Sequence, residues 1–260
     1  MSTENLYENT AYLYDFDNRD LLNDDIAIAL KCVSETRGDI LEIACGTGRV
    51  TIPILESIIG RNVTAFDLSD EMLTVFREKA EKLPIEISKN LLIKKSDMRS
   101  FNFNQTFGVV ILIWRAFQVL LNESDAVQCL ENIKFHMAEN SLFLFSVFIP
   151  QKSYGEEWVG KETEAYVVID PKTGNKIRRY TKNLKSDEQK QMIEYSSIYQ
   201  ITAPDGKSET IEDNITYRYY YPEQIKALLT KCGFTIIEES SNSTDIFLIL
   251  KRSHEKKHLA

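Results

Sequence analysis

A glycine-rich turn follows a short apolar run near residue 40. The segment EIACGTG occupies residues 42–48, directly after Asp39 to Leu41. In an open α/β sheet, such a turn lets a ligand approach the backbone closely. A dinucleotide-binding turn carries a third glycine, but counting from Gly46 and Gly48 that position is Thr51. The sequence therefore disfavours a pyrophosphate site at this turn.

Acidic side chains follow the next two strand-like runs. Asp67 ends the run that begins at Asn62, and Asp97 follows Leu91 to Lys95. A short, fixed carboxylate at a strand end can accept hydrogen bonds from two ribose hydroxyls, although Asp67 alone could equally cap a helix or form a turn. Together with the glycine turn, it indicates a nucleoside ligand. S-adenosylmethionine, which carries no phosphate and needs room for an amino-acid tail, fits this turn better than a dinucleotide.

A cation follows the fourth apolar run, Val109 to Trp114. There, Arg115 can hold a carboxylate or phosphate of a substrate, or the carboxylate of the cofactor itself. A salt bridge to a surface acid is the structural alternative. The three histidines (His136, His254 and His258) form neither a metal-ligand nor a triad pattern, so we expect no metal site and leave the catalytic residues otherwise unassigned.

The elements that must position these residues alternate from about residue 24 to residue 150. Apolar runs and helix-period segments follow one another, which is typical of a parallel sheet covered on both faces. Helices are expected after Ser69 and Asn122, each a capping residue followed by acids. The helical pattern of the second extends to Met137. Strands are predicted at Asp39 to Ala44, Asn62 to Phe66, Leu91 to Lys95, Val109 to Trp114 and Leu142 to Ile149.

Beyond residue 150 the composition of the chain changes. Nine of the 12 tyrosines lie there, between turn signals such as Pro204-Asp205-Gly206, which predicts antiparallel hairpins. Pro222 then opens a helix that Gly233 ends, and strands at Phe234 to Glu239 and Asp245 to Leu250 return to the sheet. We expect a core at 1–150, an insertion at 151–221 that forms the acceptor side, a dimer interface or both, a return segment at 222–252 and a tail at 253–260.

Composition excludes several classes of function. The net charge of −8 over 260 residues disfavours nucleic-acid binding. There is no apolar run of the roughly 20 residues that a membrane span needs, and no signal-peptide pattern. The four cysteines are dispersed without a Cys-x-x-Cys pair, so we expect reduced thiols and a cytoplasmic protein.

Three segments in order, LEIACGTGRV, AFDLSDEML and SDMRSF, together resemble the cofactor signatures of class I S-adenosylmethionine-dependent methyltransferases. Bacterial small-molecule enzymes, including aminosugar N-methyltransferases, are the most similar type. The resemblance covers Tyr7 to Ile149 and extends more weakly to the helix after Tyr221. It implies a doubly wound, mostly parallel, seven-stranded Rossmann-like sheet with an antiparallel β insertion before the last helix.

The resemblance also implies a set of cofactor contacts. Glu42 would brace the turn, the turn backbone would face the methionine part, and Asp67 would bind the ribose. Leu68 and Met72 would flank the adenine, whose amino edge would meet Asp97 and Met98, although the two apolar residues could equally belong to the core. Tyr14 would contact the methionine end or pack on the core. The expected cofactor-binding residues are Tyr14, Glu42, Ala44, Cys45, Gly46, Gly48, Asp67, Leu68, Met72, Asp97, Met98 and Trp114.

These features predict transfer of a methyl group from S-adenosylmethionine to a nitrogen or oxygen of a small polar metabolite. Some similar aminosugar enzymes carry a histidine base where this chain has Val119, so in-line displacement would rely mainly on positioning, which can supply about 7–11 kcal/mol. The alternative is a non-catalytic cofactor-binding or scaffold protein. A nicotinamide-dependent oxidoreductase is more distant, because the third glycine and a proton donor are missing.

Overall fold

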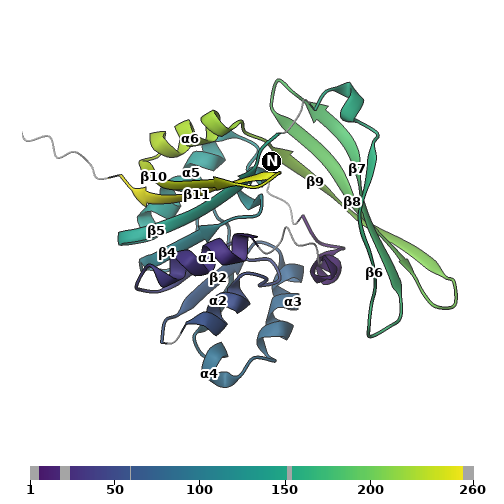
Figure 1. The fold of residues 1–260 in the computed structure, drawn as a ribbon, viewed down its shortest axis with the longest axis horizontal. Coiled ribbons are helices and arrows are strands. Elements are labelled where there is room, and N and C mark those ends of the chain that lie inside the picture. The colour runs from purple at the N-terminus through teal and green to yellow at the C-terminus, as the bar shows by residue number, and fades with distance from the viewer. Residues whose placement is uncertain (1–5, 18–23, 59, 151–153, 254–260) are drawn as a thin grey trace, which may run out of the picture.

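The computed structural model describes residues 6–17, 24–58, 60–150 and 154–253. These residues form a seven-stranded sheet in the order β10-β11-β5-β4-β1-β2-β3 and a separate four-stranded antiparallel sheet, β6-β7-β8-β9 (Figure 1). The predicted fold class, a doubly wound and mostly parallel sheet with an antiparallel insertion before the last helix, is confirmed. The core elements before the insertion are α1 (Asp24–Ser34), β1 (Ile40–Ile43), α2 (Thr51–Ser57), β2 (Val63–Asp67), α3 (Asp70–Ala80), α4 (Ile85–Ser88), β3 (Leu91–Lys95), β4 (Phe107–Leu112), the 3-10 helix η3 (Ala116–Val119), α5 (Glu123–His136) and β5 (Met137–Phe148).

The central strands are apolar along their whole length because both of their faces are covered. Every residue of β1 and β4 is buried, and the two strands pair in parallel with Ile40 opposite Val109. Side chains of α1 and α2 pack on one face of the sheet, whereas those of α5 and α6 (Pro222–Lys231) pack on the other. The antiparallel pair β10 (Phe234–Ser241) and β11 (Asp245–Arg252) completes the sheet beside β5.

Most helices and strands begin and end where the local sequence predicted, but two of the predicted ends were wrong. The Ser69 hydroxyl accepts from the Met72 amide and caps α3, as expected, and Asn122 caps α5 in the same way. The helical pattern was expected to run through Met137, but α5 ends at His136 and β5 begins at once, since Met137 pairs with Phe107 of β4.

The end of β4 is the second correction. The strand stops at Leu112 rather than Trp114, because Trp114 and Arg115 have left-handed backbones with φ of 58° and 67°. Such a conformation cannot continue a strand.

The insertion forms its own sheet from β6 (Glu162–Ile169), β7 (Lys176–Asp187), β8 (Met192–Thr202) and β9 (Ser208–Arg218), after the short 3-10 helix η4 (Glu156–Trp158). In Figure 1 this sheet stands beside the core, with the purple N-terminal segment between them. No helix in the described part of the chain has the length and apolar character that crossing a bilayer requires. Residues 254–260 of the expected tail lie outside the described residues.

The N-terminal segment joins the two sheets. Its 3-10 helix η1 (Ala11–Phe16) follows Thr10, whose amide and hydroxyl both donate to the Asp213 carboxylate of β9, at 2.9 and 2.6 Å. On the core side, the Asp15 carboxylate accepts from the Thr47 hydroxyl at 2.6 Å. The segment therefore connects the insertion sheet directly to the glycine-rich turn.

Candidate functional site

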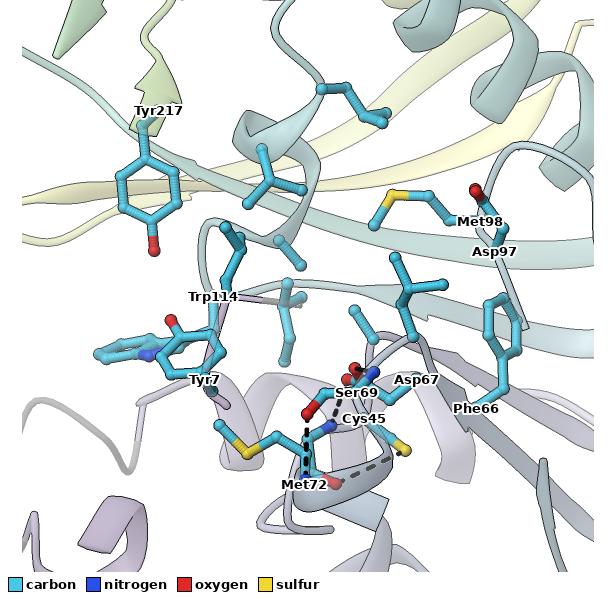
Figure 2. A pocket seen from close by; sticks show the side chains of 18 of the residues that line it. Tyr7, Cys45, Phe66, Asp67, Ser69, Met72, Asp97, Met98, Trp114 and Tyr217 are labelled. Carbon is cyan, nitrogen blue, oxygen red and sulfur yellow. Dashed lines mark hydrogen bonds between the residues drawn. The ribbon is translucent and has the colours of Figure 1, made fainter. Parts of the chain in front are cut away.

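A cavity of about 680 Å³ opens at the carboxyl ends of β1, β2 and β4, where open α/β sheets bind their ligands. Figure 2 shows Tyr7, Trp114 and Tyr217 on one side of it and Asp97 and Met98 on the other. Most residues that the sequence singled out meet here. The lining includes Tyr14, Glu42, Ala44, Cys45, Gly46, Asp67, Leu68, Met72, Asp97, Met98 and Trp114.

Asp67 fixes the floor of this cavity together with the turn. One carboxylate oxygen accepts from the Gly46 amide at 2.8 Å and the other from the Ser69 amide at 2.9 Å. Burial raises the pKa of Asp67, and these backbone hydrogen bonds oppose that effect. Ala44 and Gly46 both adopt left-handed backbones, with φ of 54° and 53°, which turn the chain sharply at the end of β1.

Gly48 has a different position from the rest of the turn. It is absent from the residues that line the cavity, although the resemblance implied a contact with the cofactor. Its φ is +78°, and a Cβ at this position would lie 2.2 Å from the ring of Phe76 on α3. Close packing between the turn and the helix therefore explains this glycine without any ligand.

Glu42 is almost fully buried at the base of the cavity. Its carboxylate accepts a hydrogen bond from the hydroxyl of Thr51, the first residue of α2, and thereby ties β1 to that helix across the turn. Burial raises the pKa of Glu42 to about 7, against the opposing effects of Thr51 and Arg49. A cationic group bound nearby would favour the ionised form.

Asp97 lies at the far side of the cavity and already has a partner. The Arg99 side chain and amide donate to its carboxylate, with Nη2 at 2.5 Å, and hold the pKa of Asp97 below its usual range. Arg99 also pairs with Asp125 at 3.0 Å. The carboxylate is thus fixed in place, and the Met98 backbone and side chain lie next to it (Figure 2).

Trp114 lies at the boundary between this cavity and a second one of about 500 Å³. The Trp114 amide donates to the Ser146 hydroxyl at 2.9 Å, which helps to hold the left-handed backbone. Trp114 lines both cavities, whereas Arg115 lines only the second. The sequence left open a salt bridge between Arg115 and a surface acid. In the structure the acid nearest to Arg115 is Asp245, and its side chain is buried.

Several lining residues were not among the sequence candidates. Arg49 lines both cavities, forms a two-pronged contact with buried Asp25 and lies 5.1 Å from the centre of the Trp114 ring. The position of Arg49 directly after the glycine turn could have identified it as a site residue from the sequence. Tyr217 and the other insertion residues could not have been identified in this way, because only the tertiary fold brings them to the strand ends. These residues are Met192, Glu194, Asn214, Thr216 and Tyr217.

The donor set suits a nucleoside that carries a charged amino-acid tail. The carboxylates of Glu42 and Asp67 lie on the side of the cavity that the glycine turn forms, together with the guanidinium of Arg49. Positive and negative groups of a ligand can therefore each meet an opposite charge there. Beside the Gly46 backbone, a methyl group would meet only the Met72 sulfur, at 3.8 Å, which leaves room for close approach of a ligand. The residues present therefore fit S-adenosylmethionine.

Comparison with known proteins agrees with this site. Residues 40–140 match the family model of a methyltransferase domain. A Geobacillus sp. (strain WCH70) protein that carries the provisional name of a methyltransferase is 25% identical over 206 residues, or 79% of this chain and 77% of the relative. The CcbJ methyltransferase of Streptomyces caelestis has a TM-score of 0.76 at 17% identity, over 98% of this chain and 100% of that one.

An amino pentose methyltransferase of Micromonospora echinaspora, CalS10, whose structure holds S-adenosylmethionine, has a TM-score of 0.71 at 15% identity. The alignment covers 93% of this chain and 95% of that one. Residues 40–140 carry a methyltransferase domain, as the three sequence segments predicted. The Rossmann-like fold of the chain is that of solved S-adenosylmethionine-dependent methyltransferases.

Proposed function

We propose that this enzyme methylates a nitrogen or oxygen of a small polar metabolite that binds in the second cavity. The observation that carries the proposal is the shared boundary of the two cavities. Tyr7, Tyr14, Arg49, Trp114 and Tyr217 line both of them, so a donor in the first and an acceptor in the second would meet at these side chains.

The roles of the cofactor residues belong to this proposal. Asp67, held by two backbone amides, would bind the ribose hydroxyls. Glu42 and Arg49 would match the charges of the amino-acid tail. Leu68 and Met72 would flank the adenine, and Asp97 with Met98 would meet its amino edge at the far side of the cavity.

When bound, S-adenosylmethionine supplies an electrophilic methyl group on a sulfonium centre. The chain's own residues would align the acceptor and exclude water, which is the main source of acceleration in such a displacement. Burial raises the pKa values of Tyr7 and Tyr195 well above the usual value of a tyrosine, so both phenols stay neutral near pH 7. They can orient an acceptor by hydrogen bonds without acting as an ionised base.

Two measurements test the proposal. Calorimetry should show S-adenosylhomocysteine binding, and incubation with methyl-labelled S-adenosylmethionine and a bacterial cell extract should give a labelled low-molecular-weight product. Binding without transfer to any small molecule would overturn the proposed function and favour the non-catalytic alternative. Label that appears only in protein or nucleic acid would overturn the small-molecule assignment.

A homodimer through the insertion remains a prediction. Light scattering on the purified protein tests it directly, with the mass of one chain, 30.0 kDa, as the reference.

A further inference from the structure

The second cavity lies between the loop after β4, the N-terminal segment and the inner side of the insertion sheet. Aromatic rings from several elements form its walls, among them Phe148, Tyr154, Trp158 and Tyr195. Tyr154 packs edge-on against Trp158 and tilted against Tyr219, and the Phe148 ring centre lies 6.5 Å from that of Tyr154. Such surfaces suit a ligand with a flat or apolar body.

Acidic residues of this cavity already have cationic or hydroxyl partners. Asp15 accepts from Lys79 Nζ at 2.7 Å as well as from Thr47. Glu164 pairs with the outward-facing Arg178 of β7. The carboxylates of Asp15 and Glu164 are therefore neutralised by cations outside the cavity, whereas Asp17, the third acid of the lining, has a favourable charge interaction with Arg179.

Arg179 is one of the cations that line this cavity. On β7 it alternates with Arg178, so its side chain faces the cavity while that of its neighbour faces outward. Its contacts include a 3.4 Å hydrogen bond to the Ser197 hydroxyl and the side chain of Tyr199, whose ring centre is 5.9 Å away. Among the described residues, no carboxylate lies within 4.0 Å of the Arg179 guanidinium.

Arg115 is the second cation. Its Nε lies 3.7 Å from Asp245 Oδ1, but within the described part of the chain neither of these buried atoms has a hydrogen-bond partner. The guanidinium lies 5.2 Å from the Phe148 ring centre and 5.7 Å from that of Trp114. A buried polar atom without a hydrogen bond costs free energy, which a ligand supplying an acceptor would recover.

Arg115 and Arg179 line the same cavity. The positive charges of Arg115 and Arg179 both act to lower the pKa of Tyr195, against the dominant effect of burial, which raises it. Both also line the cavity with Tyr195. Two guanidinium groups that line one cavity can match the oxygen atoms of a carboxylate or phosphate.

We propose, building on the proposed function, that the methyl acceptor is a small anion. Its carboxylate or phosphate binds Arg115 and Arg179, and its body packs against the aromatic walls of the second cavity. Arg115 and Arg179 are then the residues that determine acceptor specificity.

The test examines the charge of the methylated product. Product from labelled S-adenosylmethionine and the extract is passed over an anion-exchange resin at pH 7, with and without prior phosphatase treatment. Retention supports the proposal. Retention that phosphatase abolishes identifies a phosphate, and retention that survives identifies a carboxylate. Unreacted S-adenosylmethionine, which is cationic at pH 7, is first removed on a cation-exchange resin. A remaining labelled product in the unretained fraction overturns the anionic acceptor while leaving the proposed function intact, whereas no small-molecule product at all overturns the proposed function itself.

Substitutions test whether Arg115 and Arg179 each bind the acceptor. Arg115→Met and Arg179→Met should each lower kcat/KM for the retained product at least 100-fold, while the Kd of S-adenosylhomocysteine changes less than threefold. Arg179→Lys should recover part of the activity. The matched control is Lys182→Met, which removes a cation from the same strand outside the cavity and should stay within twofold of the wild type. Wild-type activity in a methionine variant that binds S-adenosylhomocysteine normally would overturn the assignment, and if one variant fails to fold the other decides.

Discussion

The two cavities are built in different ways. The floor of the first is formed by one continuous stretch, residues 42–72, in which backbone amides and strand-end carboxylates occupy positions fixed by β1 and β2. The second combines side chains from the N-terminal segment, the loop after β4 and all four strands of the insertion. The comparison teaches that a site made by the backbone can be recognised from local sequence, whereas a site made by side chains of distant segments emerges only in the fold.

Loss of the Asp67 carboxylate should have the largest effect on the first cavity. In Asp67→Ala the ribose would lose two charge-assisted hydrogen bonds, so the affinity for S-adenosylhomocysteine should fall by about 4 kcal/mol, roughly a thousandfold. Calorimetry measures this change. Asp39→Asn, at the opposite end of β1, is the control and should bind normally. Unchanged binding by a folded Asp67→Ala protein would remove Asp67 from the cofactor site.

Gly48 tests whether all of the turn serves the ligand. In Gly48→Ala the new methyl group meets the Phe76 ring on a left-handed backbone, so we expect a loss of about 3 kcal/mol in the free energy of unfolding. Gly46→Ala, where only Met72 lies near, should cost about 1 kcal/mol. Urea denaturation without cofactor measures both. Equal losses for the two variants would contradict the packing role of Gly48.

Glu42 should make the stability of the cofactor-free protein depend on pH. Burial raises its pKa in the folded state to about 7, so the folded protein binds a proton more tightly than the unfolded chain. The resulting stabilisation is complete below about pH 4.5 and is lost as the pH rises through about 7. We expect a decrease of about 3 kcal/mol in the free energy of unfolding from this group alone between pH 4.5 and pH 9.

The measurement is urea denaturation of wild type and Glu42→Gln at pH 5, 7 and 9. The variant, which cannot ionise, should lack this component of the pH dependence. Identical pH profiles for the two proteins would show that Glu42 ionises normally in the folded state.

Asp213 tests the attachment of the N-terminal segment, which lines both cavities. Asp213→Asn removes the charge that Thr10 binds, and local opening of the segment should become easier by about 1–2 kcal/mol. Limited proteolysis within residues 6–16 should then be about tenfold faster. Asp205→Asn, in an exposed turn of the same sheet, should leave the cleavage rate unchanged. Equal cleavage of wild type and Asp213→Asn would show that other contacts hold the segment.

Sequence reasoning reached the fold class and most of the lining of the first cavity, because turn chemistry, helix caps and strand ends are local properties. It did not anticipate that Gly48 serves packing, since Phe76 lies 28 residues further along the chain. The end of β4 was also missed, because nothing local indicates left-handed backbones at Trp114 and Arg115. Arg179 gave no signal, since an arginine on a hairpin strand is usually solvated and only the packing of the insertion against the core turns it inward.

The contact between Thr10 and Asp213 joins residues 203 positions apart. During synthesis, residues 6–16 leave the ribosome early but have no partner on the insertion until β9 has been made and paired. The methyltransferase domain at 40–140 can assemble well before that point. At this segment the order of synthesis is therefore the reverse of the order of assembly. Residues 6–16 are made before the insertion but dock after it, and both cavities remain open at that side until they do.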